Sequence, residues 1–148
     1  MARDSSGEEL LFRLYIWEAA LTACPSGWSL PSDDEWKTME MALGMSQGEA
    51  DDIGWRGTDE GEKMKSASGW NNNGNGTNSS GFNALPGGYR YSSGSFYNLG
   101  NHGIWWSSSE YSGSTAWNRS LYYDFYGQVY RFNYYGKPGG YSVRCLKN

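Results

Sequence analysis

Histidine and cysteine, the side chains that most often carry catalysis or bind zinc, are scarce in this sequence. The 148 residues include one histidine, His102, and two cysteines, Cys24 and Cys145, without a Cys-x-x-Cys pair. These side chains are too few for a structural zinc site, which takes four ligands. His102 lies in a glycine-rich turn with no evident serine or cysteine partner, which favours a solvated turn residue over a catalytic base. We therefore expect no enzyme activity and no zinc.

The two cysteines leave two interpretations open. A disulfide between Cys24 and Cys145 would close almost the whole chain and, by the chain-entropy estimate, stabilise the fold by about 4–5 kcal/mol. Two buried thiols in a reducing compartment are the alternative.

Basic runs and long apolar stretches are also missing. The formal net charge is −4 and lysine and arginine do not cluster, so we expect no nucleic-acid partner. No apolar stretch approaches the roughly 20 residues that span a bilayer, and no signal peptide is visible. Residues 1–9 look like a replaced or trimmed start and are expected to be disordered, so the missing signal says little about the native gene. We expect a single domain over residues 10–148.

Carboxylates are missing from the most polar loop, Asn71–Asn78. Its amides and carbonyls are oxygen donors of the kind that calcium prefers, but calcium sites usually include carboxylates as well. Acidic residues of the preceding segment are candidates to supply them: Asp51, Asp52, Asp59 and Glu60. We expect a cluster of turn residues here, with calcium as the alternative.

Glycine and aromatic residues are what the sequence has in abundance. It contains 21 glycines and 17% aromatic residues, which favours many turns around a few bulky core side chains over a helical bundle. Large aromatics mostly pack inside, so four tryptophans are predicted to be core or loop anchors. They are Trp28, Trp36, Trp55 and Trp70.

Helical signals fall in the N-terminal half. Trp17, Ala20, Leu21 and Cys24 recur at helical spacing and would share one face, before Pro25 ends the pattern.

The clearest helix begins after Ser32. Ser32 and Glu35 form a capping box, in which the serine hydroxyl accepts from the Glu35 amide and the glutamate accepts from the serine amide. Gly44 is expected to end this helix, and Glu60–Lys65 is the best candidate for a further short one. The predicted inward stripe is Trp36, Met39 and Leu43.

Strand signals follow a structureless loop over residues 67–81. Tyr89–Tyr91 and Ser95–Leu99 flank a Ser-Gly turn and predict a hairpin. Four later runs of strand length, separated by turn residues, predict a meander of consecutive strands. They are Ile104–Ser109, Ala116–Tyr123, Gln128–Tyr134 and Tyr141–Lys147. Helices first and strands afterwards indicate an α+β domain, with two main helices in the N-terminal half and an antiparallel sheet in the C-terminal half.

The last third of the chain is crowded with tyrosine, serine, asparagine and glycine. The pairs Tyr122-Tyr123 and Tyr134-Tyr135 cannot both face the core, because neighbouring strand side chains point to opposite faces. Rigid aromatic rings among adaptable polar groups are typical of a recognition surface. Strand propensity explains the aromatic residues as well, but not their crowding at turns.

Several segments, taken in order, resemble a known family. They are Cys24–Trp36, Lys65–Asn73, Gly81–Arg90, Trp105–Glu110, Ala116–Arg119 and Ser142–Cys145. Over about residues 12–148 the chain is similar to the Fibrobacter succinogenes major paralogous domain, found in secreted and surface proteins of bacteria. That family is similar to the C-type lectin-like fold and to the formylglycine-generating enzymes. The resemblance implies an α+β domain with a twisted antiparallel sheet and adjacent termini, which favours a bond between Cys24 and Cys145.

The C-terminus also resembles variable proteins of diversity-generating retroelements. In these proteins, adenine-directed mutagenesis of asparagine codons produces tyrosine, serine, aspartate, phenylalanine and glycine at ligand-contacting positions. Residues of these types are interleaved here with others that look fixed, among them Trp105, Trp106, Ala116, Leu121, Val129 and Cys145.

By this resemblance we predict a recognition domain that binds a protein or glycan, located outside the cell, on its surface or on a phage particle. The ligand-binding set would be Tyr111, Ser112, Ser114, Asn118, Tyr122, Tyr123, Asp124, Tyr126, Tyr130, Arg131, Asn133, Tyr134 and Tyr135. A structural module of a surface or phage assembly is the alternative.

Two activities associated with the fold are not expected. Formylglycine-generating enzymes use a cysteine pair in their C-terminal part, where this chain has only Cys145. The Glu-Pro-Asn, Gln-Pro-Asp and Trp-Asn-Asp motifs of calcium-dependent lectins are also missing.

Overall fold

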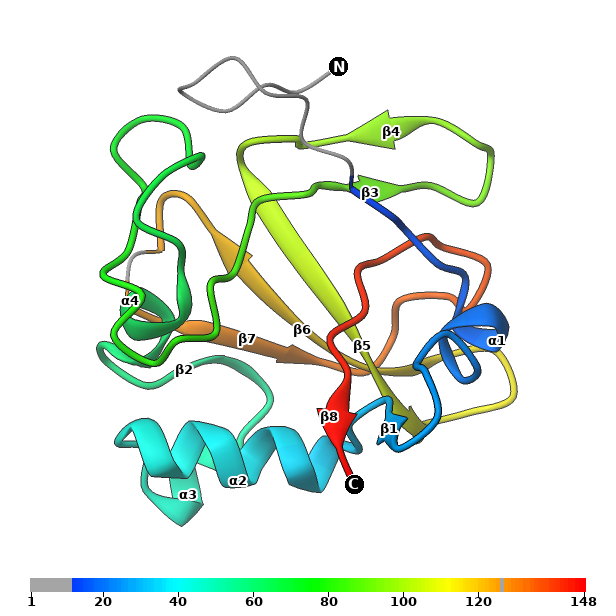
Figure 1. Cartoon of the computed structure of the whole chain (residues 1–148), viewed down its shortest axis with the longest axis horizontal. Helices are drawn as coiled ribbons and strands as arrows, with labels where there is room; N and C mark the ends of the chain where they lie inside the picture. The colour runs from blue at the N-terminus through cyan, green and yellow to red at the C-terminus, as the bar shows by residue number, and fades with distance from the viewer. Residues whose placement is uncertain (1–11, 126) are drawn as a thin grey trace.

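The computed structural model describes residues 12–125 and 127–148, with helices in the N-terminal half and an antiparallel sheet in the C-terminal half (Figure 1). The helices are α1 (Trp17–Ala20), α2 (Asp33–Leu43), α3 (Gln47–Asp51) and α4 (Glu60–Met64). The strands are β1 (Trp28–Ser29), β2 (Gly54–Arg56), β3 (Tyr89–Arg90), β4 (Phe96–Tyr97), β5 (His102–Glu110), β6 (Ala116–Tyr122), β7 (Val129–Phe132) and β8 (Leu146–Lys147). The predicted α+β class is confirmed. In the described part of the chain, no helix is both long and apolar enough to cross a membrane.

The main helix, α2, forms as its sequence predicts. The Ser32 hydroxyl accepts from the Glu35 amide at 3.1 Å, and the Ser32 amide donates to the Glu35 carboxylate at 2.7 Å. Gly44 ends the helix with φ +135°, a value that side chains other than glycine rarely adopt. Trp36 is buried, and Met39 and Leu43 pack against the same core, so the predicted inward stripe is confirmed.

The first helix is shorter than predicted. Trp17 and Ala20 are buried as expected, but α1 ends at Ala20 and Leu21 is exposed. The predicted helical face through Leu21 and Cys24 is therefore wrong. After Ala20 the chain is no longer helical, and Cys24 lies within bonding distance of Cys145.

The sheet has the strand order β2-β7-β6-β5, with antiparallel neighbours throughout. The predicted meander is confirmed for β5, β6 and β7, and the hairpin for β3 and β4. The predicted fourth strand of the meander, Tyr141–Lys147, is wrong. Tyr141 and Ser142 make isolated bridges to Tyr15 and Trp105, whereas β8 pairs with β1.

The fourth strand of the sheet is β2, in the acidic segment where the sequence indicates only helical turns. Three residues, Gly54–Arg56, are too few to show a period of two, and their pairing with β7 is a tertiary contact.

Each face of the sheet packs against a separate hydrophobic core, because side chains alternate along the strands. The first core joins the sheet to α2 and α4 and contains Trp36, Met45, Met64, Trp70, Ala84, Trp105, Leu121 and Val129. The second lies against α1 and contains Trp17, Ala20, Leu30, Ile104, Trp106, Ala116 and Tyr141. Figure 1 shows α2 below the sheet and α1 at its side.

A buried ion-pair network links α2 to three strands. Asp33 accepts from Arg119 of β6 and from Arg131 of β7, each at 2.7 Å. Glu40 pairs with Arg119 at 2.5 Å and also with Arg56 of β2. All five side chains are buried. Such a cluster is stable only when every charge keeps its partners, because burying an unpaired charge is costly.

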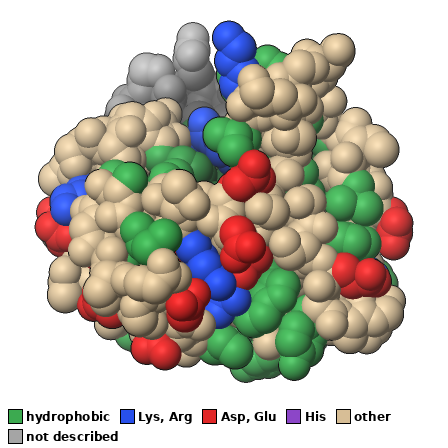
Figure 2. Space-filling model, turned by 90° about the horizontal axis from the view of Figure 1, so that it is seen from below, with side chains coloured by type: hydrophobic (Ala, Val, Ile, Leu, Met, Phe, Trp, Pro, Cys, Tyr) green, Lys and Arg blue, Asp and Glu red, His purple; other side chains and the backbone are tan. Residues whose placement is uncertain are grey.

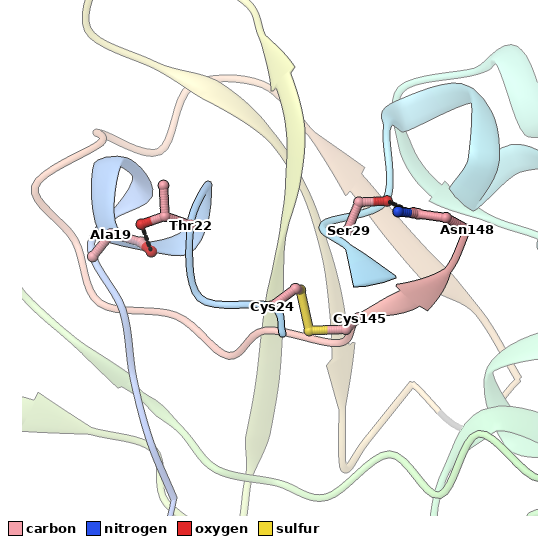
Figure 3. Close-up of a disulfide and its surroundings, with 6 residues drawn as sticks. All are labelled: Ala19, Thr22, Cys24, Ser29, Cys145 and Asn148. Atoms are coloured by element: carbon pink, nitrogen blue, oxygen red, sulfur yellow. Dashed lines mark hydrogen bonds between the residues drawn. A yellow bond between two sulfur atoms is a disulfide. The ribbon is translucent and has the colours of Figure 1, made fainter. Parts of the chain in front are cut away.

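A disulfide between Cys24 and Cys145 joins the segment that follows α1 to the segment that precedes β8 (Figure 3). Beside it, β1 pairs with β8, and the Ser29 hydroxyl donates to the Asn148 side chain at 2.6 Å. The bond favoured by the family resemblance is therefore present. Disulfides persist in oxidising compartments, so this bond is consistent with an extracytoplasmic location.

Replacing Asp33 by Asn should destabilise the protein by about 3–5 kcal/mol, because Arg119 and Arg131 would lose their shared carboxylate inside the fold. Burial raises the pKa of Asp33, but hydrogen bonds and charges of the two arginines outweigh it and lower that pKa below 3.8. The stabilisation by the carboxylate is therefore complete above the unfolded-state pKa, and it is lost as the pH falls through the folded-state pKa. Urea unfolding should be measured from neutral pH to about pH 3. The free energy of unfolding should fall less over this range in Asp33→Asn than in the wild type.

The matched control is the neighbouring residue. The Asp34 side chain is 92% exposed and pairs with Lys37 at 3.5 Å, so Asp34→Asn should cost less than about 1 kcal/mol. Equal effects of the two substitutions would contradict the assigned role of the network.

Candidate functional site

The face of the sheet that points away from α2 is covered by the second hydrophobic core only along β5. On the β2 and β7 side it carries aromatic side chains. Trp55 of β2 lies opposite Tyr130 of β7, and Tyr130 lies opposite Ser120 of β6. Tyr122 and Phe132 share this face, since each alternates with a residue that points to the α2 side.

Trp55 is the centre of the first group of rings. Phe125, in the connection after β6, stacks on it with centroids 4.1 Å apart and planes within 3°. Tyr122 and Tyr130 approach the same indole at 4.9 and 4.8 Å. The β6–β7 connection is thereby packed onto β2 through aromatic contacts.

Further contacts continue this group into a closed ring of side chains. From Tyr130 they pass to Phe132 at 4.8 Å and on to Tyr135 at 4.5 Å. Tyr135 meets Tyr141 at 5.6 Å, and Tyr141 meets Tyr89 of the hairpin at 6.4 Å.

His102 closes the ring. It stacks on Tyr122 with centroids 3.6 Å apart and lies 6.3 Å from Tyr89. We call this set the aromatic face. It comprises Trp55, Tyr89, His102, Tyr122, Phe125, Tyr130, Phe132, Tyr134, Tyr135 and Tyr141.

Five titratable side chains of the aromatic face have pKa values shifted in the direction that favours their neutral forms. Burial raises the pKa of Tyr122, Tyr135 and Tyr141. Burial, together with a hydrogen bond to Tyr134, raises the pKa of Tyr130 to about 12. Burial lowers the pKa of His102. At neutral pH these five side chains are therefore uncharged.

Some of the predicted ligand set lies on this face and some does not. Those on it are Tyr122, Tyr130, Tyr134 and Tyr135, with Tyr134 64% exposed. Asp124 is exposed in the β6–β7 connection, beside Phe125. Tyr126 lies outside the described residues.

Four predicted residues are buried or pack against the first core. Asn118, Arg131 and Asn133 are buried, and Arg131 is held by Asp33 rather than offered to a ligand. Tyr123 packs against the first core, on the opposite side from Tyr122. Each of the two tyrosine pairs is thus divided: Tyr122 and Tyr123 lie on opposite sides, and Tyr134 is exposed while Tyr135 packs against the second core.

The remaining three predicted residues form the β5–β6 connection at the other end of the sheet. Tyr111 is 57% exposed and meets Trp117 edge-on at 5.4 Å. Ser112 accepts from the Thr115 amide at 3.2 Å and shapes the turn. The Lys137 amide donates to the Ser114 carbonyl at 3.0 Å, which joins this turn to the segment that follows Tyr135.

Sequence reasoning missed the residues that complete the aromatic face. Trp55, predicted to be an anchor, is half-buried at its centre, whereas Trp36 and Trp70 are core residues as predicted. Tyr89, His102 and Tyr141 come from three further segments, and only tertiary contacts bring them together. Phe125 follows the Tyr122-Tyr123 pair, so the aromatic crowding at turns is a signal that could have found it.

The side of the molecule that carries α2 and α3 has a different character (Figure 2). Acidic and basic side chains lie beside one another there, between patches of hydrophobic ones. Lys37 is within 3.0–3.7 Å of the carboxylates of Asp33, Asp34 and Asp51. An apolar groove of about 340 Å³ runs along α2, but none of the predicted ligand set lines it.

The Asn71–Asn78 loop uses part of its amide chemistry internally. Asn75 accepts from the Trp70 amide at 2.9 Å, and Asn78 accepts from the Asn83 amide at 2.7 Å. Within residues 12–125 and 127–148, no group of three or more acidic, histidine or cysteine side chains is placed to hold a metal. Calcium at this loop stays the alternative to a cluster of turn residues.

Structure and surface together define an α+β domain with an exposed, aromatic-rich C-terminal surface. Its family follows from a comparison with family models: the model of the Fibrobacter succinogenes major domain matches residues 1–147, and the chain belongs to this family. No curated protein and no solved structure is significantly similar to the chain.

A buried lysine supports the β6–β7 connection. The Lys65 ammonium donates to the carbonyls of Tyr122 and Phe125, the latter at 3.4 Å, and burial lowers its pKa to about 8.

Replacing Lys65 by Met should destabilise the protein by about 1–3 kcal/mol, because these carbonyls lose a donor. Hydrogen exchange should accelerate over residues 122–125. Lys63→Met is the control, since Lys63 donates to Leu43 instead; equal exchange in the two variants would contradict the role of Lys65.

Proposed function

We propose that this domain is a non-enzymatic recognition module with a C-type lectin-like fold, and a variable protein of a diversity-generating retroelement. Its ligand, a protein or a glycan, binds across the aromatic face and the adjoining connections. The observation that carries the proposal is the continuous array of rings on the open half of one sheet face, from Phe125 through Trp55 to Tyr135.

The chemistry of the face suits recognition. Tyrosine and tryptophan supply contact area at little cost in conformational entropy, and serine and asparagine adapt their hydrogen bonds. Asp124 adds a charge at one rim, where it favours ligands of complementary charge.

The division between buried and exposed positions supports diversification. The residues that look fixed in the sequence, Trp105, Trp106, Ala116, Leu121 and Val129, are all at most 3% exposed. Tyr111, Asp124 and Tyr134 lie in the same segment of the chain with their side chains exposed. Surface positions of this kind can change without opening the core.

His102 supports a non-enzymatic role. Its ring is stacked on Tyr122 at 3.6 Å and half-buried, and burial lowers its pKa. A ring held in this way contributes to packing. The disulfide supports a location outside the cytoplasm, on a bacterial surface or a phage particle.

Two matched four-position libraries test the proposal. The surface library randomises Tyr111, Ser114, Asp124 and Tyr134. The interior library randomises Asn118, Arg119, Leu121 and Arg131. Most surface variants should keep a cooperative thermal transition, because exposed substitutions usually cost about 0.5 kcal/mol or less each. Most interior variants should fail to fold.

Selection of both libraries against unrelated proteins should yield binders from the surface library only. Surface variants that unfold as often as interior ones, or a folded surface library that yields no binder, would contradict the proposal.

A structural module is the second candidate, because apolar side chains are exposed around the β3–β4 hairpin. Phe96, Tyr91, Tyr97 and Leu99 are 71%, 58%, 49% and 45% exposed. Exposed apolar surface of this kind often marks a contact between proteins. Under this alternative, sedimentation analysis should detect concentration-dependent self-association that Phe96→Ser abolishes. A monomer at all concentrations would remove the support for it.

A further inference from the structure

A pocket of about 410 Å³ lies where the aromatic face meets the β3–β4 hairpin. Five tyrosines, one serine, one proline and two glycines line it, and no charged side chain does. The tyrosines are Tyr89, Tyr91, Tyr134, Tyr135 and Tyr141. Gly139 allows close packing at this point, because a Cβ there would lie 2.7 Å from the Tyr141 hydroxyl.

The rings around the pocket are inclined toward one another. Tyr141 meets Tyr89 at 63° and Tyr135 at 46°, and Tyr134 meets Tyr135 at 47°. Their centroids are 5.6–6.4 Å apart between neighbours. The rings that line the pocket therefore have different inclinations. A flat platform for stacking a sugar ring would need nearly coplanar rings.

Neither of the two basic residues nearest in sequence to these tyrosines lines the pocket. Lys137 pairs with Glu110 and lies over the Trp17 ring at 4.4 Å. Arg90 lies between two of the tyrosines in sequence but does not line the pocket. The pocket is therefore lined by tyrosine rings, whose faces carry partial negative charge, with no charged side chain among them.

We propose that this pocket is an aromatic cage for a quaternary ammonium group, such as the trimethylammonium of choline. A cation between neighbouring rings would lie within about 6 Å of each centroid, the range in which ring faces attract cations. A quaternary ammonium group has no N–H to donate, so tyrosine rings without a carboxylate satisfy it. The net charge of the domain, −4, also favours a cationic ligand. This inference rests on the proposed recognition function and assigns a ligand class to one part of the same surface.

Calorimetric titration with choline and with 3,3-dimethylbutan-1-ol, its uncharged analogue of the same shape, tests the cage. Choline should bind saturably and the neutral analogue should not. The double variant Tyr91→Ala/Tyr134→Ala removes two exposed walls and should weaken choline binding by about tenfold or more. Tyr111→Ala is the matched control, because Tyr111 is equally exposed but does not line the pocket.

A conservative variant distinguishes the contribution of the Tyr134 ring to choline binding from that of its hydroxyl. Tyr134→Phe should keep choline affinity, because the attraction depends on the ring face. Equal binding of the neutral analogue, a loss in Tyr134→Phe as large as in Tyr134→Ala, or no saturable choline binding by the folded protein would overturn the proposal. Folding of each variant is checked by its thermal transition.

Two further arms identify the source of the ammonium group. Phosphatidylcholine vesicles that sediment with the protein, when phosphatidylglycerol vesicles do not, would indicate a lipid headgroup. Binding of soluble phosphocholine without vesicle binding would indicate a free or polymer-attached group. If choline fails to bind while the surface library still yields binders, the cage is wrong and the recognition function stands.

Discussion

The ion-pair network between α2 and the sheet is the interaction on which the rest of this domain depends. Two carboxylates from one helix, Asp33 and Glu40, hold arginines from β2, β6 and β7 inside the protein. Buried charges tolerate little displacement, because each lost partner leaves a desolvated charge. The network therefore fixes the position of the helix on one sheet face. It also links the short strand β2 to β7, which brings Trp55 opposite Tyr130.

Because α2 is held on one sheet face, it does not cover the second face. Its β5 side is packed beneath α1, while its β2 and β7 side carries rings and exposed connections. A scaffold closed by a disulfide and an ion network can accept change at exposed positions, since those positions contribute little to folding. The combination of a rigid interior with an uncharged aromatic surface is the physical basis of the recognition role that we propose.

Local signals in the sequence predicted local structure well. The capping box at Ser32 and the turns between β5, β6 and β7 required only nearby residues, and both are confirmed. Strand β2 and the ion network could not be predicted, because their partners lie far away in sequence. Arg131 illustrates the limit: an arginine in a tyrosine-rich strand has the composition of a binding surface, yet Asp33, 98 residues away, holds its side chain inside. Side chains alternate between the two faces along β7. Knowing which face α2 covers would therefore have assigned Arg131 to the interior and Tyr130 to the opposite face.

Sequencing the 3′ end of this gene in many individual cells or phage of one population would distinguish a diversified receptor from a module of fixed sequence. In a diversified receptor, variation should be concentrated in exposed codons, such as those of Tyr111 and Tyr134, with Trp106, Arg119 and Arg131 constant. A uniform 3′ end, or variation that falls equally on buried and exposed positions, would contradict the proposal that this domain is diversified.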